Sequence, residues 1–230
     1  MTVQNIFFID ARVENYQAFV AGLQATDAWV LLNPDQDGLD QMVRALSGVK
    51  DLASIQIISH GAEASLTLGS AALNLETVQN YQVQLAAIGA SLSTQGDIQL
   101  YGCDVAQGAK GEQFVQAIAQ LTQADVAASK DLTGAAAAGG NWTLEYAVGQ
   151  INTSVLVPAN YNKTLDTING DSYGNNLTGT SGNDTINGLG GADTIDGQAG
   201  SDSLSGGDGD DKIEGNFGND SLYGGNGNDT

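Results

Sequence analysis

The 230-residue sequence is poor in several residue types, and each shortage excludes something. It contains one cysteine, Cys103, so an intrachain disulfide is impossible. It has 7 lysines and arginines against 27 acidic residues, which makes nucleic acid and anionic membranes unfavourable partners. No apolar run of about 18 residues is present, so we expect no membrane span. The first ten residues also lack the basic start and long apolar stretch of a signal peptide.

The composition changes near residue 165. Residues 1–164 have the apolar runs and alanine-rich stretches of a globular domain, whereas residues 165–230 consist mainly of Gly, Asn, Asp, Ser and Thr. The second segment holds 12 acidic residues and a single base, Lys212. A segment so acidic and so poor in apolar residues stays disordered unless a cation neutralises it. We therefore predict a globular domain over 1–164 and a calcium-dependent domain over 165–230.

A nine-residue period runs through the second segment. Each unit follows the pattern GxxGxDxUx, where U is aliphatic, as in GGDGDDKIE at 206–214. The aspartates of the pattern are Asp184, Asp193, Asp202, Asp211, Asp220 and Asp229. The glycines two residues before them are Gly182, Gly191, Gly200, Gly209, Gly218 and Gly227. In the first nonapeptide, which begins at Gly170, Asn175 replaces the aspartate, so we interpret that nonapeptide as a cap.

This pattern resembles the RTX repeat, which binds Ca²⁺ in a parallel β-roll. The resemblance implies two nonapeptides per coil, so that aspartates 18 apart stack into two ladders. The chemistry agrees, because carboxylates and glycine-exposed carbonyl oxygens are the ligands that Ca²⁺ prefers. A flexible Gly/Asn linker is the alternative, and six aspartates in phase argue against it. Thr230 precedes the aliphatic position of its unit, so we expect the array to be truncated.

The first domain alternates apolar strand patterns with helical patterns. We predict strands at 3–9, 29–32, 54–59, 97–101 and 125–128, a small hairpin within 66–74, and a closing hairpin within 142–155. We predict helices at 15–24, 38–46, 75–92 and 111–122. This order predicts an α/β fold with a mostly parallel sheet covered on both faces. Sites in such sheets gather at the carboxyl ends of the strands.

The only histidine and the only cysteine follow two of these strands. His60-Gly61 comes after SIQIIS, and Gly102-Cys103 comes after DIQLY. The arrangement resembles caspase-like cysteine peptidases. The segments IISHGAEASLTLG, DIQLYGCDVAQG and GGNWTLE also resemble the DUF4347 type of domain over about residues 3–157. The peptidase resemblance implies a caspase-like three-layer sandwich, with Cys103 as nucleophile and His60 as base and acid. It further implies an oxyanion hole made by the N–H groups of Gly61 and Cys103.

The same resemblance points to substrate contacts at the neighbouring strand ends. Ser129, between Ala128 and Lys130, is expected to line the pocket, and the specificity residue is expected just after the first strand. Asp10 and Arg12 both lie there and select opposite charges, so the specificity stays open. The sequence departs from the caspase signature, because Tyr101-Gly102 precedes Cys103. We expect Asp104 to cap the following helix.

Two classes of function remain open. The first is a secreted calcium-binding protein, exported by a type I route, with a cysteine endopeptidase domain that cuts a peptide or its own parent chain. The second is a non-catalytic head of a calcium-stabilised surface adhesin or S-layer-type protein, in which Cys103 and His60 are structural. A weaker third is a hydrolase of another ester or amide that uses the same two residues.

Overall fold

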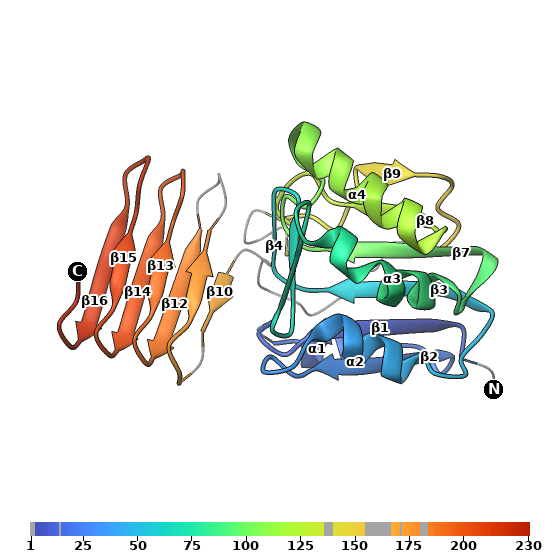
Figure 1. Ribbon diagram of the computed structural model, residues 1–230, viewed down its shortest axis with the longest axis horizontal. Helices are drawn as coiled ribbons and strands as arrows, with labels where there is room; N and C mark the ends of the chain where they lie inside the picture. The colour runs from blue at the N-terminus through green and yellow to red at the C-terminus, as the bar shows by residue number, and fades with distance from the viewer. Residues whose placement is uncertain (1–2, 14, 136–139, 155–166, 171, 180–183) are drawn as a thin grey trace. The chain divides into compact units, whose positions relative to one another are not determined.

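The computed structural model describes residues 3–13, 15–135, 140–154, 167–170, 172–179 and 184–230. Contacts between Cα atoms divide the chain into two compact units, Met1–Leu165 and Asp166–Thr230. The first unit carries the helices and one large sheet, and the second carries the strands of the repeats (Figure 1).

A six-stranded sheet forms the centre of the first unit, in the order β2-β1-β3-β7-β8-β9. All neighbours are parallel except the last pair, in which β9 runs antiparallel to β8. The strands are β1 (Asn5–Asp10), β2 (Asp27–Leu32), β3 (Leu52–Ile58), β7 (Leu92–Tyr101), β8 (Asp125–Ala128) and β9 (Tyr146–Val148). The predicted parallel sheet is therefore confirmed. The inner strands β1, β3 and β8 are largely buried on both faces, as expected for a parallel sheet that is covered on both sides.

The two faces of the sheet are covered differently. Three helices pack on one face, over a core of aliphatic side chains: α2 (Gly38–Ala45), α3 (Gln82–Gly89) and α4 (Gly108–Thr122). A short 3₁₀ turn, Val78–Tyr81, leads into α3. Asp37 begins α2 by accepting the N–H of Asp40 at 3.0 Å.

The second face carries one short helix among the described residues, α1 (Gln17–Val20). A smaller cluster of buried residues lies beneath it, and Phe19 meets Trp142 edge to face in this cluster. The predicted helix at 15–24 was too long, because Asn15 takes a left-handed φ of 54° and prevents an earlier start. The predicted long helix at 75–92 was also wrong, since it divides into the 3₁₀ turn and α3.

A small antiparallel sheet follows the end of β3. It consists of β4 (Gly61–Ala62), β5 (Ser65–Leu68) and β6 (Ala71–Asn74). Its apolar side chains, such as Leu66 and Leu68, join the core beneath the three helices. The predicted hairpin is thus confirmed as β5 and β6, and β4 begins directly after His60.

The second unit stacks its strands into two parallel sheets. One sheet contains β10 (Thr167–Asn169), β12 (Thr185–Gly190), β14 (Ser203–Asp208) and β16 (Ser221–Asn226). The other contains β11 (Asn176–Thr178), β13 (Thr194–Asp196) and β15 (Lys212–Glu214). Every registered pair joins residues 18 apart, for example Ile186 with Leu204, as the stacking of two nonapeptides per coil predicts. Ile186, Ile195 and Leu204 form the narrow core.

No helix in the described ranges is long and apolar enough to cross a membrane.

Candidate functional sites

The aspartates of the repeats form two internal ladders. Asp184, Asp193, Asp202 and Asp211 are almost fully buried, with 2–3% of their surface exposed. In each ladder one carboxylate oxygen reaches back 18 residues and accepts a backbone N–H. Asp202 Oδ1 accepts the N–H of Asp184 at 2.9 Å, and Asp211 Oδ1 accepts the N–H of Asp193 at 2.8 Å. Because these hydrogen bonds join successive coils, they fix where each carboxylate lies.

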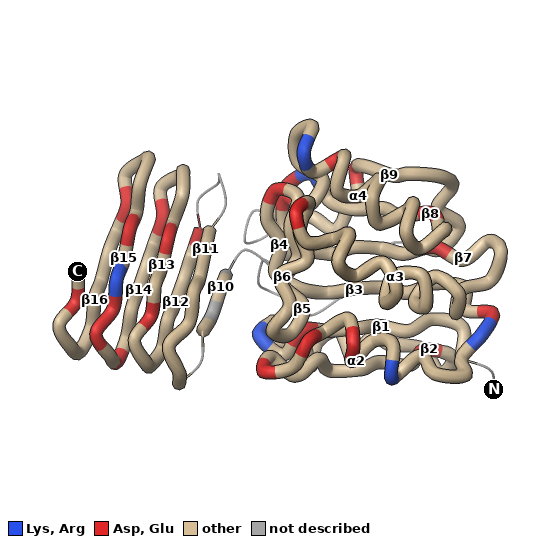
Figure 2. The backbone as a smooth tube through the Cα atoms, viewed as in Figure 1, with Lys and Arg blue, Asp and Glu red and all other residues tan. Residues whose placement is uncertain are grey.

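The second carboxylate oxygen has no such contact at two of these positions. Asp202 Oδ2 and Asp211 Oδ2 are buried without a hydrogen-bond partner. A buried anionic oxygen left unpaired is costly, so these atoms fit a bound cation. Acidic residues are distributed along both sheets of the repeats, and Lys212 is the one basic residue among them (Figure 2).

Two glycines of each nonapeptide make room for the buried aspartate side chains and for the turns between strands. A Cβ on Gly197 would lie 2.5 Å from Asp202 Oδ2, so the first glycine leaves the space that the oxygen occupies. The second glycine has positive φ at Gly191, Gly200, Gly209, Gly218 and Gly227, with values from 100° to 143°. These angles suit glycine alone, so a side chain at any of these positions would strain the backbone. Gly182 lies outside the described residues.

The ligands available in the repeats are those of a calcium site. No group of three or more His, Cys, Asp or Glu side chains is positioned to hold a metal in the described ranges. A cation here would therefore be held by one or two carboxylates together with backbone carbonyl oxygens. That mixture suits Ca²⁺, which accepts six to eight oxygen ligands in irregular geometry, better than Mg²⁺, which requires an octahedron.

The electrostatic environment of Asp202 also fits a cation. Burial raises the pKa of its carboxyl above the ordinary value of 3.8, and the nearby charge of Asp220 raises it as well. The N–H of Asp184 lowers the pKa by donating to the ionised form. Burial has the larger effect, so the ionised carboxylate is disfavoured at this position, and a bound cation would remove that penalty.

In the first unit, the ends of β3 and β7 lie side by side. Ser59 donates its N–H to the carbonyl of Tyr101, the last residue of β7, at 3.0 Å, which continues the pairing one residue beyond β3. Gly61 then packs directly against the next turn, since a Cβ on it would lie 2.7 Å from the carbonyl oxygen of Cys103. His60-Gly61 and Gly102-Cys103 are therefore neighbours in space, and glycine at 61 permits that approach.

Cys103 itself lies inside the protein. Its side chain has no exposed surface and belongs to the cluster that contains Ile9, Tyr101 and Trp142. The sulfur receives the N–H of Thr133 at 3.2 Å. His60 is 6% exposed, and its Nε2 lies 3.3 Å from the carbonyl oxygen of Arg12. Neither side chain is open to a substrate in this arrangement.

The other predicted substrate contacts also have their polar atoms engaged. Asp10 is fully buried and accepts the N–H of Gly69 at 2.7 Å and the N–H of Arg12 at 3.0 Å. The Arg12 guanidinium pairs with Asp10 at 3.4 Å and donates to the carbonyl of Gly69 at 2.9 Å. These contacts tie the end of β1 to the turn between β5 and β6.

At the end of β8, Ser129 is fully buried, and its hydroxyl donates to the carbonyl of Asp131 at 2.9 Å. The neighbouring Lys130 pairs with Glu112 at 2.6 Å. The expectation that Asp104 caps α4 was wrong, because the residue before that helix is Gln107. Asp104 instead accepts the side-chain amide of Gln107 at 2.9 Å.

Two sets of buried residues were not predicted from the sequence. Thr133, which contacts the Cys103 sulfur, lies 30 positions away and no motif marks it. The second set is a row of buried polar residues on β3 and β7, namely Ser54, Gln56, Asp97 and Gln99. A signal for it was present, since polar residues alternate with apolar ones in strands predicted to be buried on both faces.

Comparison with known families agrees with this division of the chain. Residues 6–168 match the domain of unknown function DUF4347. Residues 169–204 and 196–230 match the RTX calcium-binding nonapeptide repeat. No curated protein and no solved structure matches the chain. The chain thus belongs to the DUF4347 family, and its tail consists of calcium-binding nonapeptide repeats of the kind typical of secreted proteins.

Proposed function

We propose that this chain is a secreted or cell-surface protein whose tail folds around Ca²⁺ as a parallel β-roll. The observation that carries the proposal is the pair of buried, unpartnered carboxylate oxygens, Asp202 Oδ2 and Asp211 Oδ2. Each lies beside a glycine that leaves it space. Without a cation these charges oppose folding, and with one they hold successive coils together.

The proposed ligands form two rows. One row is Asp184, Asp202 and Asp220, and the other is Asp193, Asp211 and Asp229. Backbone carbonyl oxygens of the turns complete each site, and the glycines at 191, 200, 209, 218 and 227 shape those turns. When bound, Ca²⁺ supplies positive charge between coils, so binding and folding of the tail are one process.

Calcium titration of the full chain tests this proposal. After treatment with EDTA, addition of Ca²⁺ should increase the β signal in far-ultraviolet circular dichroism, and Mg²⁺ at the same concentration should not. A spectrum that ignores Ca²⁺ would contradict the proposal. An equal response to Mg²⁺ would show general charge screening instead of a calcium site.

A second candidate function is cysteine endopeptidase activity of the first unit, on a peptide or on the parent chain. It is favoured by one observation, the backbone contact between Gly61 and the Gly102-Cys103 turn. In this proposal His60 removes the proton of Cys103, and the N–H groups of Gly61 and Cys103 bind the developing oxyanion. The N–H of Thr133 at the sulfur would stabilise the thiolate. The residues that cover Cys103 would have to move before a substrate could enter.

The rival proposal is a non-catalytic head domain, with the same fold and a structural thiol. The full burial of Cys103 among aromatic and aliphatic side chains favours it, because a thiol shielded from solvent in this way is inert. The two proposals predict opposite reactivity of the Cys103 sulfur: high in a peptidase and low in a structural thiol.

A thiol-reactive probe on the native chain distinguishes them, with Cys103→Ala as the blank. A peptidase requires a rate above that of free cysteine at pH 7 and a large decrease in His60→Ala. A structural thiol requires protection until the first unit unfolds, whichever residue occupies position 60. Mass spectrometry of a longer form of the protein, with and without Ca²⁺, then shows whether any cleavage depends on Cys103.

A further inference from the structure

Four polar residues lie buried on the sheet face opposite α2, α3 and α4. Ser54 and Gln56 come from β3, and Asp97 and Gln99 come from β7; they are 0–3% exposed. Ser54 is registered with Asp97, and Gln56 with Gln99. Gln56 and Asp97 are therefore diagonal neighbours on adjacent strands, within reach of a long side chain.

A chain of hydrogen bonds fixes the orientation of the Gln56 amide. Asn5 Nδ2 donates to Asp27 Oδ1 at 2.8 Å, so Asn5 Oδ1 faces Ser54. Ser54 Oγ must then donate to that oxygen, at 2.9 Å, and can only accept from Gln56 Nε2, at 3.4 Å. The amide of Gln56 thus faces Ser54 with its nitrogen. Its Oε1 points elsewhere, buried and without a partner.

Asp97 presents a second unpartnered oxygen on the same face. Its Oδ2 accepts the N–H groups of Asn152 at 2.6 Å and Thr153 at 3.0 Å. Its Oδ1 is buried and has no partner. In the described part of the chain, the ion pairs formed by arginine and lysine involve other acids. A buried carboxylate with one oxygen unsatisfied is unfavourable unless a cation or a donor approaches it.

We propose that Asp97 Oδ1 and Gln56 Oε1 are ligands of a bound monovalent cation, Na⁺ or K⁺. Both ligands are hard oxygens, which suits these ions. The site has one negative charge and one neutral amide oxygen, which matches an ion of charge +1. It lies within the first unit and is separate from the aspartate ladders of the repeats. Its role is to neutralise Asp97, which holds residues 152–153 against the sheet.

Tryptophan fluorescence makes the site measurable in the full chain. The only two tryptophans, Trp29 and Trp142, both lie in the first unit, so unfolding of the repeats does not contribute. Thermal unfolding is followed in EDTA, with NaCl or KCl exchanged against choline chloride at constant ionic strength. A bound ion stabilises by mass action, and at ten times its Kd it shifts the folding equilibrium about elevenfold. The midpoint should therefore rise with Na⁺ or K⁺, and choline should have no such effect.

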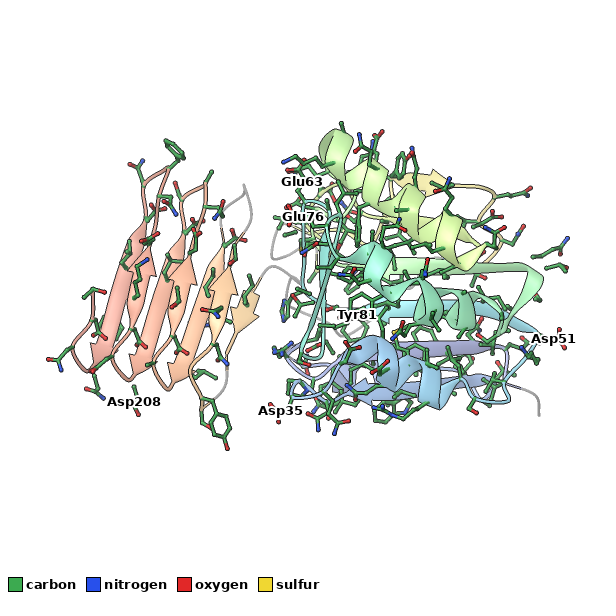
Figure 3. All side chains as sticks on the ribbon, viewed as in Figure 1. Asp35, Asp51, Glu63, Glu76, Tyr81 and Asp208 are labelled. Atoms are coloured by element: carbon green, nitrogen blue, oxygen red, sulfur yellow. The ribbon has the colours of Figure 1, made fainter. Side chains whose placement is uncertain are left out.

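Asp97→Asn is the informative variant. Its oxygen can still accept the N–H groups of Asn152 and Thr153, and its new amide can donate to Gln56 Oε1. We expect the midpoint of thermal unfolding of this variant to be the same in Na⁺, K⁺ and choline. In choline, this midpoint should be no lower than that of the natural protein. Asp51→Asn is the matched control, because Asp51 is exposed (Figure 3) and loses the same charge; it should keep the response to the cation.

Two results would overturn the proposal. One is an equal midpoint for the natural protein in Na⁺, K⁺ and choline. The other is a cation response that Asp97→Asn retains. Crystals soaked in thallium(I), an anomalous scatterer of K⁺ size, give a test that needs no variant. A thallium peak within ligand distance of both oxygens supports the proposal. A water molecule there, or a protonated Asp97 that donates to Gln56, contradicts it.

Discussion

Replacing Asp202 by asparagine removes one charge from the middle of an aspartate ladder and keeps its shape. Asp202 Oδ1 accepts the N–H of Asp184 at 2.9 Å, and the amide oxygen of asparagine can do the same. The loss is confined to Oδ2, the buried oxygen without a partner. A contact to a charged group is worth about 2 kcal/mol in such a setting. Calcium affinity should therefore fall about thirtyfold at the sites that Asp202 lines.

The assay is calorimetric titration of the EDTA-treated full chain with Ca²⁺, with circular dichroism in parallel. Asp208→Asn is the matched control, since Asp208 is exposed on the repeats (Figure 3) and its carboxylate accepts the side-chain amide of Asn226 at 2.8 Å. It should change the affinity less than threefold, as expected for a screened surface charge. Asp229→Asn should lie between the two, because Asp229 is only partly buried. Equal losses in Asp202→Asn and Asp208→Asn would refute the ladder and leave only diffuse charge attraction.

Three further predictions follow from single residues. In EDTA, the repeats should gain β structure as the pH falls toward 3.8. The raised pKa of Asp202 means that its ionised form destabilises the calcium-free fold, and this penalty disappears on protonation. Circular dichroism against pH tests this, and a loss of structure on acidification would contradict it. Leu189→Gly should stabilise the calcium-bound repeats by about 1 kcal/mol, since Leu189 is 56% exposed and has a left-handed φ of 72°. The equivalent position in the next coil is already a glycine, Gly207. Urea titration in Ca²⁺ measures the change, and lower stability would show that the leucine makes stabilising contacts. Gly61→Ala should destabilise the first unit by about 1–3 kcal/mol, because the added Cβ would lie 2.6 Å from Val105 Cγ2. Tryptophan fluorescence in urea tests this, and an unchanged calcium affinity of the repeats serves as the control.

Periodic parts of the chain were predictable from sequence. The strand Asp125–Ala128 has the predicted bounds, and α4 begins three residues earlier than predicted. The repeats follow their period, because the spacing of glycine, aspartate and aliphatic residues directly sets the coil. In these regions local pattern and final structure depend on the same few residues.

The surroundings of Cys103 were not predictable in the same way. Its position after β7 follows from the strand pattern, but its burial depends on Thr133 and Trp142, which approach from an irregular segment. Such a segment has no period, so its path is set by tertiary packing. For the same reason, the predicted hairpin at 142–155 reduced to β9 alone among the described strands of this region.

The backward reach of each aspartate gives the repeats a polarity. Asp193, Asp202, Asp211, Asp220 and Asp229 each satisfy an amide of the coil before them, so every coil is completed by its successor. Such an array behaves as a one-dimensional Ising chain with nearest-neighbour coupling. A defective rung then acts as a domain wall, which separates the stack into two blocks that order independently. The position of a defect, and not only its presence, should set the cooperativity of the calcium transition, and a defect at the centre should reduce its Hill coefficient the most.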